Sequence, residues 1–170
     1  SESVVAQMSD LFVLLLAPAG GDELQGVKRG IMEMADLILI NKADGDLKPA
    51  ATRTCADYTG ALRLLRKRPQ DPEDFPKAMM VSALHEDGLA KVWDEMQTLA
   101  NWRRETAHWD AARAGQAVYW FEDSVRNGLL AQLTQNAELA ARMADLRTKV
   151  AAGETTVGTA ARDILAKLNL

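Results

Sequence analysis

Residues 35–44 read ADLILINKAD, an apolar run followed at once by a mostly polar quartet. A continuous apolar run that contains β-branched residues is typical of a buried parallel strand, so we predict a strand over 36–40. Open α/β sheets bind their ligands at the carboxyl ends of such strands. The position of Asn41, Lys42 and Asp44 therefore predicts a ligand site directly after this strand.

These three side chains suit a guanine base. An ionised carboxylate accepts two parallel hydrogen bonds, and guanine offers N1–H and its exocyclic amine side by side. Adenine lacks this donor pair and would leave Asp44 unpaired, at a cost of about 1–3 kcal/mol. The stem of Lys42 can cover the flat face of the base. The alternative is that 41–44 is only a polar loop that ends the strand and begins the next helix.

Residues 1–100 repeat a strand followed by a helix three times. We expect strands at 10–16, 36–40 and 78–81, and helices at 22–34, 47–67 and 89–99. This order is the signature of a parallel, doubly wound α/β sheet. Three strands are few for such a sheet and would leave apolar edges open. We therefore expect the chain to be the second half of a larger α/β domain. The basic run Arg63, Arg66, Lys67 and Arg68 is expected to be a solvated helix end.

Residues 101–170 contain no proline and no strand-like run, and they are rich in good helix formers. We expect helices at 101–135, 137–150 and 157–168, with the domain boundary near 100–102. This second part is predicted to be an all-helical arm.

Composition excludes several classes of protein. A net charge of −4 and a pI near 5.2 argue against a general nucleic-acid or anionic-membrane surface. No apolar run approaches the ~20 residues of a membrane span. Cys55 is the single cysteine, which favours a reducing, cytoplasmic compartment. With only two histidines beside it, and no metal-ligand spacing, we expect no protein metal site.

Ser82-Ala83-Leu84 follows the third predicted strand, one helix and one strand after Asn41–Asp44. Together the two stretches resemble the guanine-specificity motif and the second base-contacting loop of P-loop GTPases. In that resemblance the Ala83 N–H donates to guanine O6, and Asn41 braces the loop and approaches N7. Residues 20–33, GGDELQGVKRGIME, are similar to the MeaB/ArgK family of GTPases, and this resemblance covers nearly the whole chain.

The resemblance implies GTP or GDP as the cofactor and a GTPase chaperone as the function. Such chaperones load and protect adenosylcobalamin in methylmalonyl-CoA mutase, so this mutase or a related one is the implied partner. The loop at 20–28 would be a nucleotide-responsive switch in which Asp22, Gln25 and Lys28 signal to the partner. Residues 101–170 would be a homodimerisation arm. Older names of relatives refer to lysine/arginine/ornithine transport, but we find no residues here that bind amino acids.

One motif of P-loop GTPases is absent from the sequence, namely the phosphate loop G-x-x-x-x-G-K-[ST]. That loop cradles the phosphates with backbone N–H groups and places a hydroxyl on Mg²⁺, and phosphoryl transfer depends on this positioning. We therefore expect a guanine half-site with no catalytic residue, no GTP hydrolysis by this chain alone, and Mg²⁺ only in a full-length protein. The alternative is a non-catalytic dimeric module that docks on an acyl-CoA mutase and has a vestigial nucleotide site.

Overall fold

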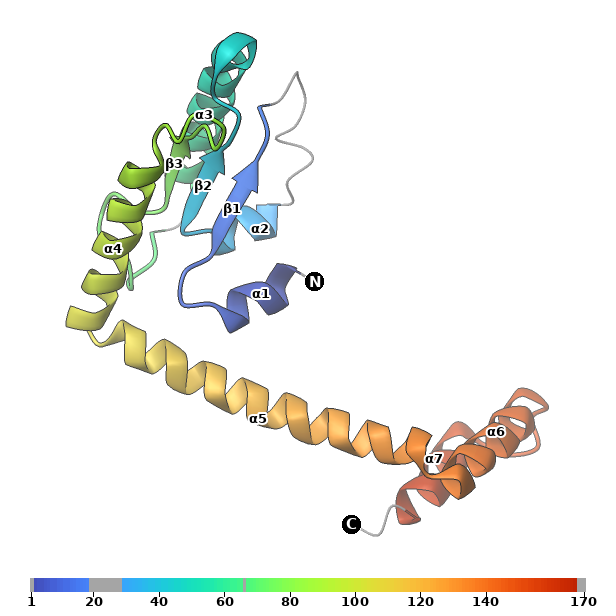
Figure 1. Ribbon diagram of the computed structural model, residues 1–170. Coiled ribbons are helices and arrows are strands. Elements are labelled where there is room, and N and C mark those ends of the chain that lie inside the picture. The colour runs from blue at the N-terminus through green and yellow to red at the C-terminus, as the bar shows by residue number, and fades with distance from the viewer. Residues whose placement is uncertain (1, 19–28, 66, 168–170) are drawn as a thin grey trace. The chain divides into compact units, whose positions relative to one another are not determined.

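The computed structural model describes residues 2–18, 29–65 and 67–167 (Figure 1). The chain divides into two compact units, Ser1–Gln116 and Ala117–Leu170. The first unit holds the sheet and the helices that pack on it, and the second holds a helical hairpin. Helix α5 (His108–Gln135) runs from one unit into the other.

The first unit contains a three-stranded sheet in the order β1-β2-β3. The strands are β1 (Val13–Leu16), β2 (Leu37–Ile40) and β3 (Lys77–Met80), and all of them are parallel. The register places Ile38 beside Leu14 on one side and beside Ala78 on the other. The predicted parallel sheet is therefore confirmed, with each strand within a few residues of its expected position.

Helices cover both faces of this sheet (Figure 1). One face is covered by α2 (Arg29–Met34) and α3 (Lys48–Arg63), and the other by α4 (Leu89–Glu105). The core residues on the first face are Met32, Ile38, Ile40, Tyr58 and Leu62. Those on the second face are Leu37, Leu39, Val92 and Leu99. Because all four residues of β2 are buried, the strand is apolar throughout rather than alternating.

Two helices differ from the sequence prediction. Helix α4 runs to Glu105, not to residue 99, and α5 begins at His108, not at residue 101. The break falls at Ala107, whose φ of 60° is left-handed, after Thr106 closes the last turn on Trp102 O. No glycine or proline marks this break, so the sequence carries no signal for it. Helix α1 (Glu2–Met8) was not predicted either.

Helix α3 ends at Arg63, four residues before its predicted end, and the basic run that follows is not fully solvated. The side chain of Arg68 is only 18% exposed and forms ion pairs with Asp36, at 2.9 Å, and Asp71, at 2.6 Å. The prediction of a solvated helix end is therefore wrong for Arg68, because Asp36, 32 residues away in the sequence, and Asp71, in the same loop, hold its guanidinium inside the fold.

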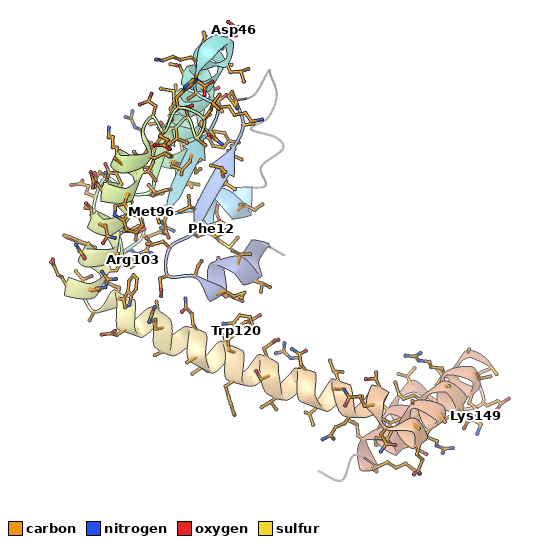
Figure 2. The ribbon with its side chains drawn as sticks, in the orientation of Figure 1. Phe12, Asp46, Met96, Arg103, Trp120 and Lys149 are labelled. Atoms are coloured by element: carbon orange, nitrogen blue, oxygen red, sulfur yellow. The ribbon has the colours of Figure 1, made fainter. Side chains whose placement is uncertain are left out.

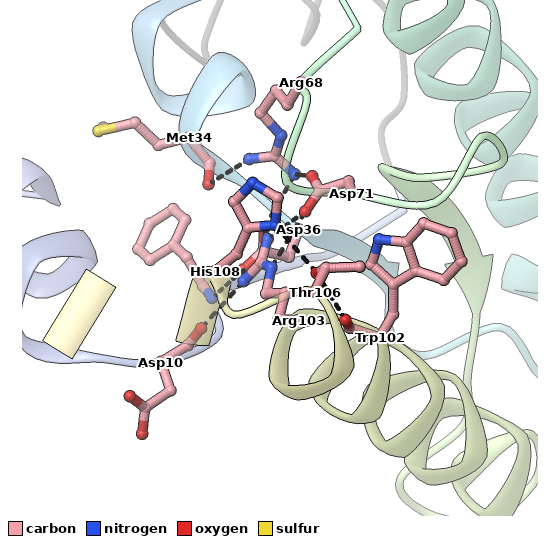
Figure 3. A network of polar contacts seen from close by, with 10 residues as sticks. Asp10, Met34, Asp36, Arg68, Asp71, Trp102, Arg103, Thr106 and His108 are labelled. Atoms are coloured by element: carbon pink, nitrogen blue, oxygen red, sulfur yellow. Dashed lines mark hydrogen bonds and ion pairs between the residues drawn. The ribbon is translucent and has the colours of Figure 1, made fainter. Parts of the chain in front are cut away.

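A buried ion network joins the ends of these elements (Figure 3). The Arg103 guanidinium donates hydrogen bonds to both carboxylate oxygens of Asp36, at 2.6 and 3.2 Å, and forms an ion pair with Asp71 at 2.6 Å. Asp36 accepts a further hydrogen bond from the Phe12 N–H at 2.7 Å. Arg103 and Asp36 are 9% and 4% exposed. Burial lowers the pKa of Arg103, but its hydrogen bonds to the two carboxylates outweigh this and leave the pKa raised.

The second unit contains a hairpin of α6 (Ala137–Ala151) and α7 (Val157–Ala166). Side chains cap both helices, because Asn136 accepts from the Glu138 N–H and Thr156 accepts from the Thr159 N–H. Leu146, Ala160 and Ile164 form a small core between the two helices. No helix among the described residues is both long and apolar enough to cross a membrane.

We predict that Arg103→Met destabilises the first unit. The substitution leaves Asp36 and Asp71 buried without their main counter-charge, and breaking a buried pair in this way costs about 3–5 kcal/mol. Arg104→Met on the same helix is the matched control, since Arg104 is exposed and its loss should cost about 1 kcal/mol or less. Urea denaturation measures both unfolding free energies. Equal losses in the two variants would contradict the role assigned to the network.

Candidate functional site

The predicted site residues lie at one edge of the sheet. Asn41–Asp44 follow β2 and Ser82–Leu84 follow β3, and the carboxyl ends of neighbouring parallel strands meet at the same edge. Figure 2 labels Asp46, just past the first loop, at the opposite end of the unit from Arg103. The site and the ion network therefore occupy opposite ends of the same strands.

Asn41 connects the two loops. Its Oδ1 accepts hydrogen bonds from the Lys42 N–H at 2.8 Å and the Ala83 N–H at 3.1 Å. A backbone hydrogen bond from the Ala43 N–H to Val81 O, at 3.0 Å, also joins the first loop to the end of β3. Because the amide oxygen is occupied within the protein, the amide NH₂ is the group that Asn41 can offer to a ligand, and that group is a donor.

Asp44 is held by Ser82. The Ser82 hydroxyl donates to Asp44 Oδ2 and accepts from the His85 N–H, which lies 3.1 Å away. Ser82 is 1% exposed and is fixed further by its antiparallel bridge to Asp87. An ionised carboxylate has about four lone-pair positions. The bond from Ser82 therefore orients Asp44 and still leaves it able to accept two parallel donors from a ligand.

Lys42 has an unusual backbone. Its φ is 60°, in the left-handed region, which costs an L-residue other than glycine, asparagine or aspartate roughly 1–2 kcal/mol. The neighbouring bond from the Lys42 N–H to Asn41 helps to hold this conformation. Its side chain is exposed, so the stem is available to cover a ligand. Strained residues of this kind gather at functional sites.

Hydrogen bonds join Asn41 to Lys42 and Ala83, and Asp44 to Ser82, so five of the six predicted base-site residues take part. The sixth residue, Leu84, follows Ala83 in the second loop, and 78% of its surface is exposed. The Ala83 N–H already donates to Asn41, so a ligand oxygen has to share this N–H or displace Asn41. The predicted switch residues Asp22, Gln25 and Lys28 fall outside the described residues.

The sequence alone gave no role to the Ser82 hydroxyl or to Gly88. The Ser82–Asp44 contact could have been inferred, because both residues follow neighbouring parallel strands. Gly88 has a φ of 78°, and a Cβ on it would lie 2.8 Å from Met80 O. Only glycine fits this close approach, which closes the turn that carries Ser82. The described residues contain no cluster of three or more His, Cys, Asp or Glu side chains able to hold a metal ion.

The arrangement presents a carboxylate acceptor, Asp44, and an amide donor, Asn41, with the exposed side chain of Lys42 in the same loop. A planar ligand with two adjacent donors and a nearby acceptor would complement these groups. Guanine presents this pattern through N1–H, the exocyclic amine and N7. That guanine binds at this site stays a prediction.

Comparison with known protein families gives a match over most of the chain. Residues 1–138 match the family described as "Methylmalonyl Co-A mutase-associated GTPase MeaB". A solved crystal structure, of a LAO/AO transport system kinase, aligns with a TM-score of 0.75 and 26% identity. That alignment covers 99% of this chain and 53% of the other chain.

Curated relatives agree with this match. The mouse "Methylmalonic aciduria type A homolog, mitochondrial" is 40% identical over 98% of this chain and 40% of its own length. A "Putative GTPase" of Caulobacter vibrioides is 40% identical over 100% of this chain and 51% of its own length. The "GTPase ArgK" of Escherichia coli is 33% identical over 81% of this chain and 41% of its own length. The chain thus spans about half, or less, of the length of these relatives.

We predict that Gly88→Ala disturbs the site more than the replacement by alanine of another glycine with a similar φ. Gly153 is the matched control, because its φ of 74° is similar but nothing lies within 4 Å of its added Cβ. Both substitutions should cost roughly 1–2 kcal/mol through φ. Only Gly88→Ala should add about 1–3 kcal/mol of overpacking against Met80 O.

Amide hydrogen exchange measures the local opening free energy around each glycine. We expect Gly88→Ala also to shift the amide resonances of Ser82 and Asp87, whose mutual hydrogen bonds close this turn at 3.0 and 3.1 Å. Equal costs at the two glycines, with an undisturbed Ser82 amide, would show that the Met80 contact does not hold the loop.

Proposed function

The chain belongs to the MeaB family of GTPases, and from this premise we propose that it supplies the guanine-recognition half of a GTP site. The observation that carries the proposal is the pair of Asp44 and Asn41, fixed by Ser82 and Ala83 at the carboxyl edge of a parallel sheet. Asp44 accepts from guanine N1–H and the exocyclic amine, and the Asn41 amide donates to N7. Lys42 covers the ring, and the Ala83 N–H donates to O6 while sharing its hydrogen with Asn41 Oδ1.

This sequence contains no G-x-x-x-x-G-K-[ST] loop, the motif that would form the phosphate half of the site. We propose that a full-length protein holding both halves binds GTP with Mg²⁺ and hydrolyses it, and that these 170 residues alone do not. The family's own description supports this, because it names a GTPase. A cytoplasmic location is proposed from the single cysteine, Cys55.

The partner we propose is methylmalonyl-CoA mutase or a related cobalamin-dependent mutase. The support is the family description, "Methylmalonyl Co-A mutase-associated GTPase MeaB". The protein would then act as a GTP-driven chaperone of the mutase's adenosylcobalamin, with Asp22, Gln25 and Lys28 reporting the nucleotide state. A binding assay with purified mutase, repeated with GTP, with GDP and without nucleotide, tests this proposal. A complex that ignores the nucleotide would favour the non-catalytic interaction module instead.

We further propose a division of labour between residues 1–100, which hold the base site, and residues 101–170, which form a homodimer. The support for the dimer is an apolar stripe on α5. Val118, Phe121 and Val125 recur at i, i+3 and i+7, and they are 57%, 68% and 47% exposed. An exposed apolar stripe of this spacing is suited to packing against another helix.

We predict that Asp44→Asn exchanges the base preference of the full-length protein. Asparagine presents a donor where guanine's amine also donates, whereas xanthine offers a carbonyl oxygen at that position. GTP binding should weaken by about ten- to a hundredfold relative to xanthosine triphosphate, which corresponds to the cost of an unsatisfied polar pair. Competition between the two nucleotides measures the ratio. Asp46→Asn, at an exposed residue two positions further on, should leave it unchanged, and an unchanged ratio for Asp44→Asn would refute the assignment.

We predict that the 170-residue chain forms dimers and that Phe121→Asp with Val125→Asp makes it monomeric. Charges placed in an apolar interface lose hydration without gaining a partner, so the association constant should collapse. Analytical ultracentrifugation over a range of concentrations measures the change. Ser124→Asp lies on the same helix, outside the stripe, and should remain dimeric. A dimer that survives the double substitution would place the interface elsewhere.

A further inference from the structure

The outer edge of β3 carries open backbone groups. Lys77 N bonds to Asp36 O and Val81 N bonds to Ile40 O, so these alternate residues direct their ladder groups to β2. In a strand the intervening residues direct their groups to the opposite side. The backbone N–H and C=O groups of Ala78 and Met80 therefore point away from β2. No described residue donates to or accepts from the Ala78 N–H, the Ala78 C=O or the Met80 N–H. The Met80 carbonyl lies against Gly88.

A groove of about 570 Å³ runs along this edge. We call it the edge groove; β3, the C-terminal turn of α3, the N-terminal turns of α4 and the loop before β3 line it. Leu62, Phe75, Ala78 and Met79 supply apolar lining. An open strand edge beside an apolar groove is the arrangement by which extended peptides bind by strand addition, with main-chain bonds for affinity and side-chain pockets for specificity.

Charge in the edge groove is uneven. Lys77 pairs with two carboxylates, Asp74 and Glu95, at 2.6 Å each, so this cluster carries a net charge of −1. Burial lowers the pKa of Lys77, but its bonds to these two carboxylates outweigh burial and leave the pKa raised. Lys67 pairs with Glu73 at 2.9 Å. Arg63 and Lys91 also line the groove, and neither forms an ion pair with any described residue.

These two unpaired cations lie toward opposite ends of the edge groove. Arg63 is the last residue of α3 and Lys91 is in the first turn of α4, and both helices run antiparallel to the strands, as Figure 1 shows. The carboxylates near them are committed to Lys67 and Lys77. Each end of the open strand therefore has one unpaired positive charge, while the cluster around Lys77 is net negative.

We propose that the edge groove binds an extended acidic peptide segment of a partner protein, which adds a fourth strand along β3. The peptide backbone forms hydrogen bonds with the Ala78 N–H and C=O and with the Met80 N–H, and its apolar side chains enter the groove. The acidic side chains at its two ends pair with Arg63 and Lys91. This inference does not depend on the nucleotide site. An interface of this kind is sensitive to salt, because its ion pairs are exposed.

The test uses the 170-residue chain and a blocked six-residue peptide of alternating valine and threonine with glutamate at both ends. Such a peptide spans about 20 Å when extended, which exceeds the length of β3. In an NMR titration we expect the amide resonances of Ala78 and Met80 to shift and their hydrogen exchange to slow. The same peptide with lysine at both ends should bind at least about threefold more weakly.

Two variants of the chain test the two parts of the interface. Arg63→Glu combined with Lys91→Glu should weaken the acidic peptide by about three- to tenfold, and the exposed Arg53→Glu on α3 is the control. Ala78→Pro removes an outward N–H while leaving the ladder to β2 intact, and it should abolish the amide shift at Met80. If that variant does not fold, the charge-reversed pair still decides the outcome.

Three results would overturn the proposal. They are equal binding of the lysine-ended peptide, shifts confined to residues away from β3, and slowed exchange at Ala78 and Met80 that grows with protein concentration in the absence of peptide. The last result would assign the edge to a second copy of the chain.

Discussion

The pairing of Asp36 with Arg103 is the constraint on which the first unit depends. Asp36 lies directly before β2, and its carboxylate is gripped by Arg103 from α4, by Arg68 from the loop after α3, and by the Phe12 N–H ahead of β1. One buried side chain thus ties together two strand entries, a loop and a helix end (Figure 3). A buried charge without partners is costly, so these segments have to meet for the unit to fold.

This constraint also positions the base site at the opposite edge of the sheet. With the strand entries fixed, the parallel register fixes where the strands end, and Asn41 and Ser82 follow directly from those ends. Residues that follow neighbouring strands are then close enough for Asn41 to reach the Ala83 N–H and for Ser82 to reach Asp44. The N-terminal part of α5 is held near the same ion network, because Arg113 forms an ion pair with Asp10 at 2.7 Å. The hydrogen bond from Arg113 lowers the pKa of Asp10, although burial opposes this.

Local pattern was enough to predict the sheet, because β2 is apolar at every position and glycine, proline or polar loops bound each strand. Local pattern could not predict the end of α4, because no helix-breaking residue marks the left-handed Ala107. Tertiary contacts follow the break, since the guanidinium groups of Arg104 and Arg113 lie over the Trp109 ring, 4.2 and 5.2 Å from its centroid. Arg68 was misjudged because its partner Asp36 is 32 residues away and its partner Asp71 lies in a loop. In the proposed base site, residue types did not predict that the Ala83 N–H donates to Asn41 Oδ1.

Hydrogen bonds within the protein hold the side chains of the proposed base site. Asn41 Oδ1 accepts from two backbone N–H groups, the Ser82 hydroxyl donates to Asp44, and Gly88 allows the close turn that carries Ser82. All of these contacts are made within residues 41–88, so the geometry of the proposed base site requires no contribution from a phosphate loop. Preorganisation of this kind reduces the entropy that a ligand has to overcome on binding. The left-handed φ of Lys42 costs energy in the same loop, and such strain persists where the surrounding bonds hold it, here the bond from the Lys42 N–H to Asn41.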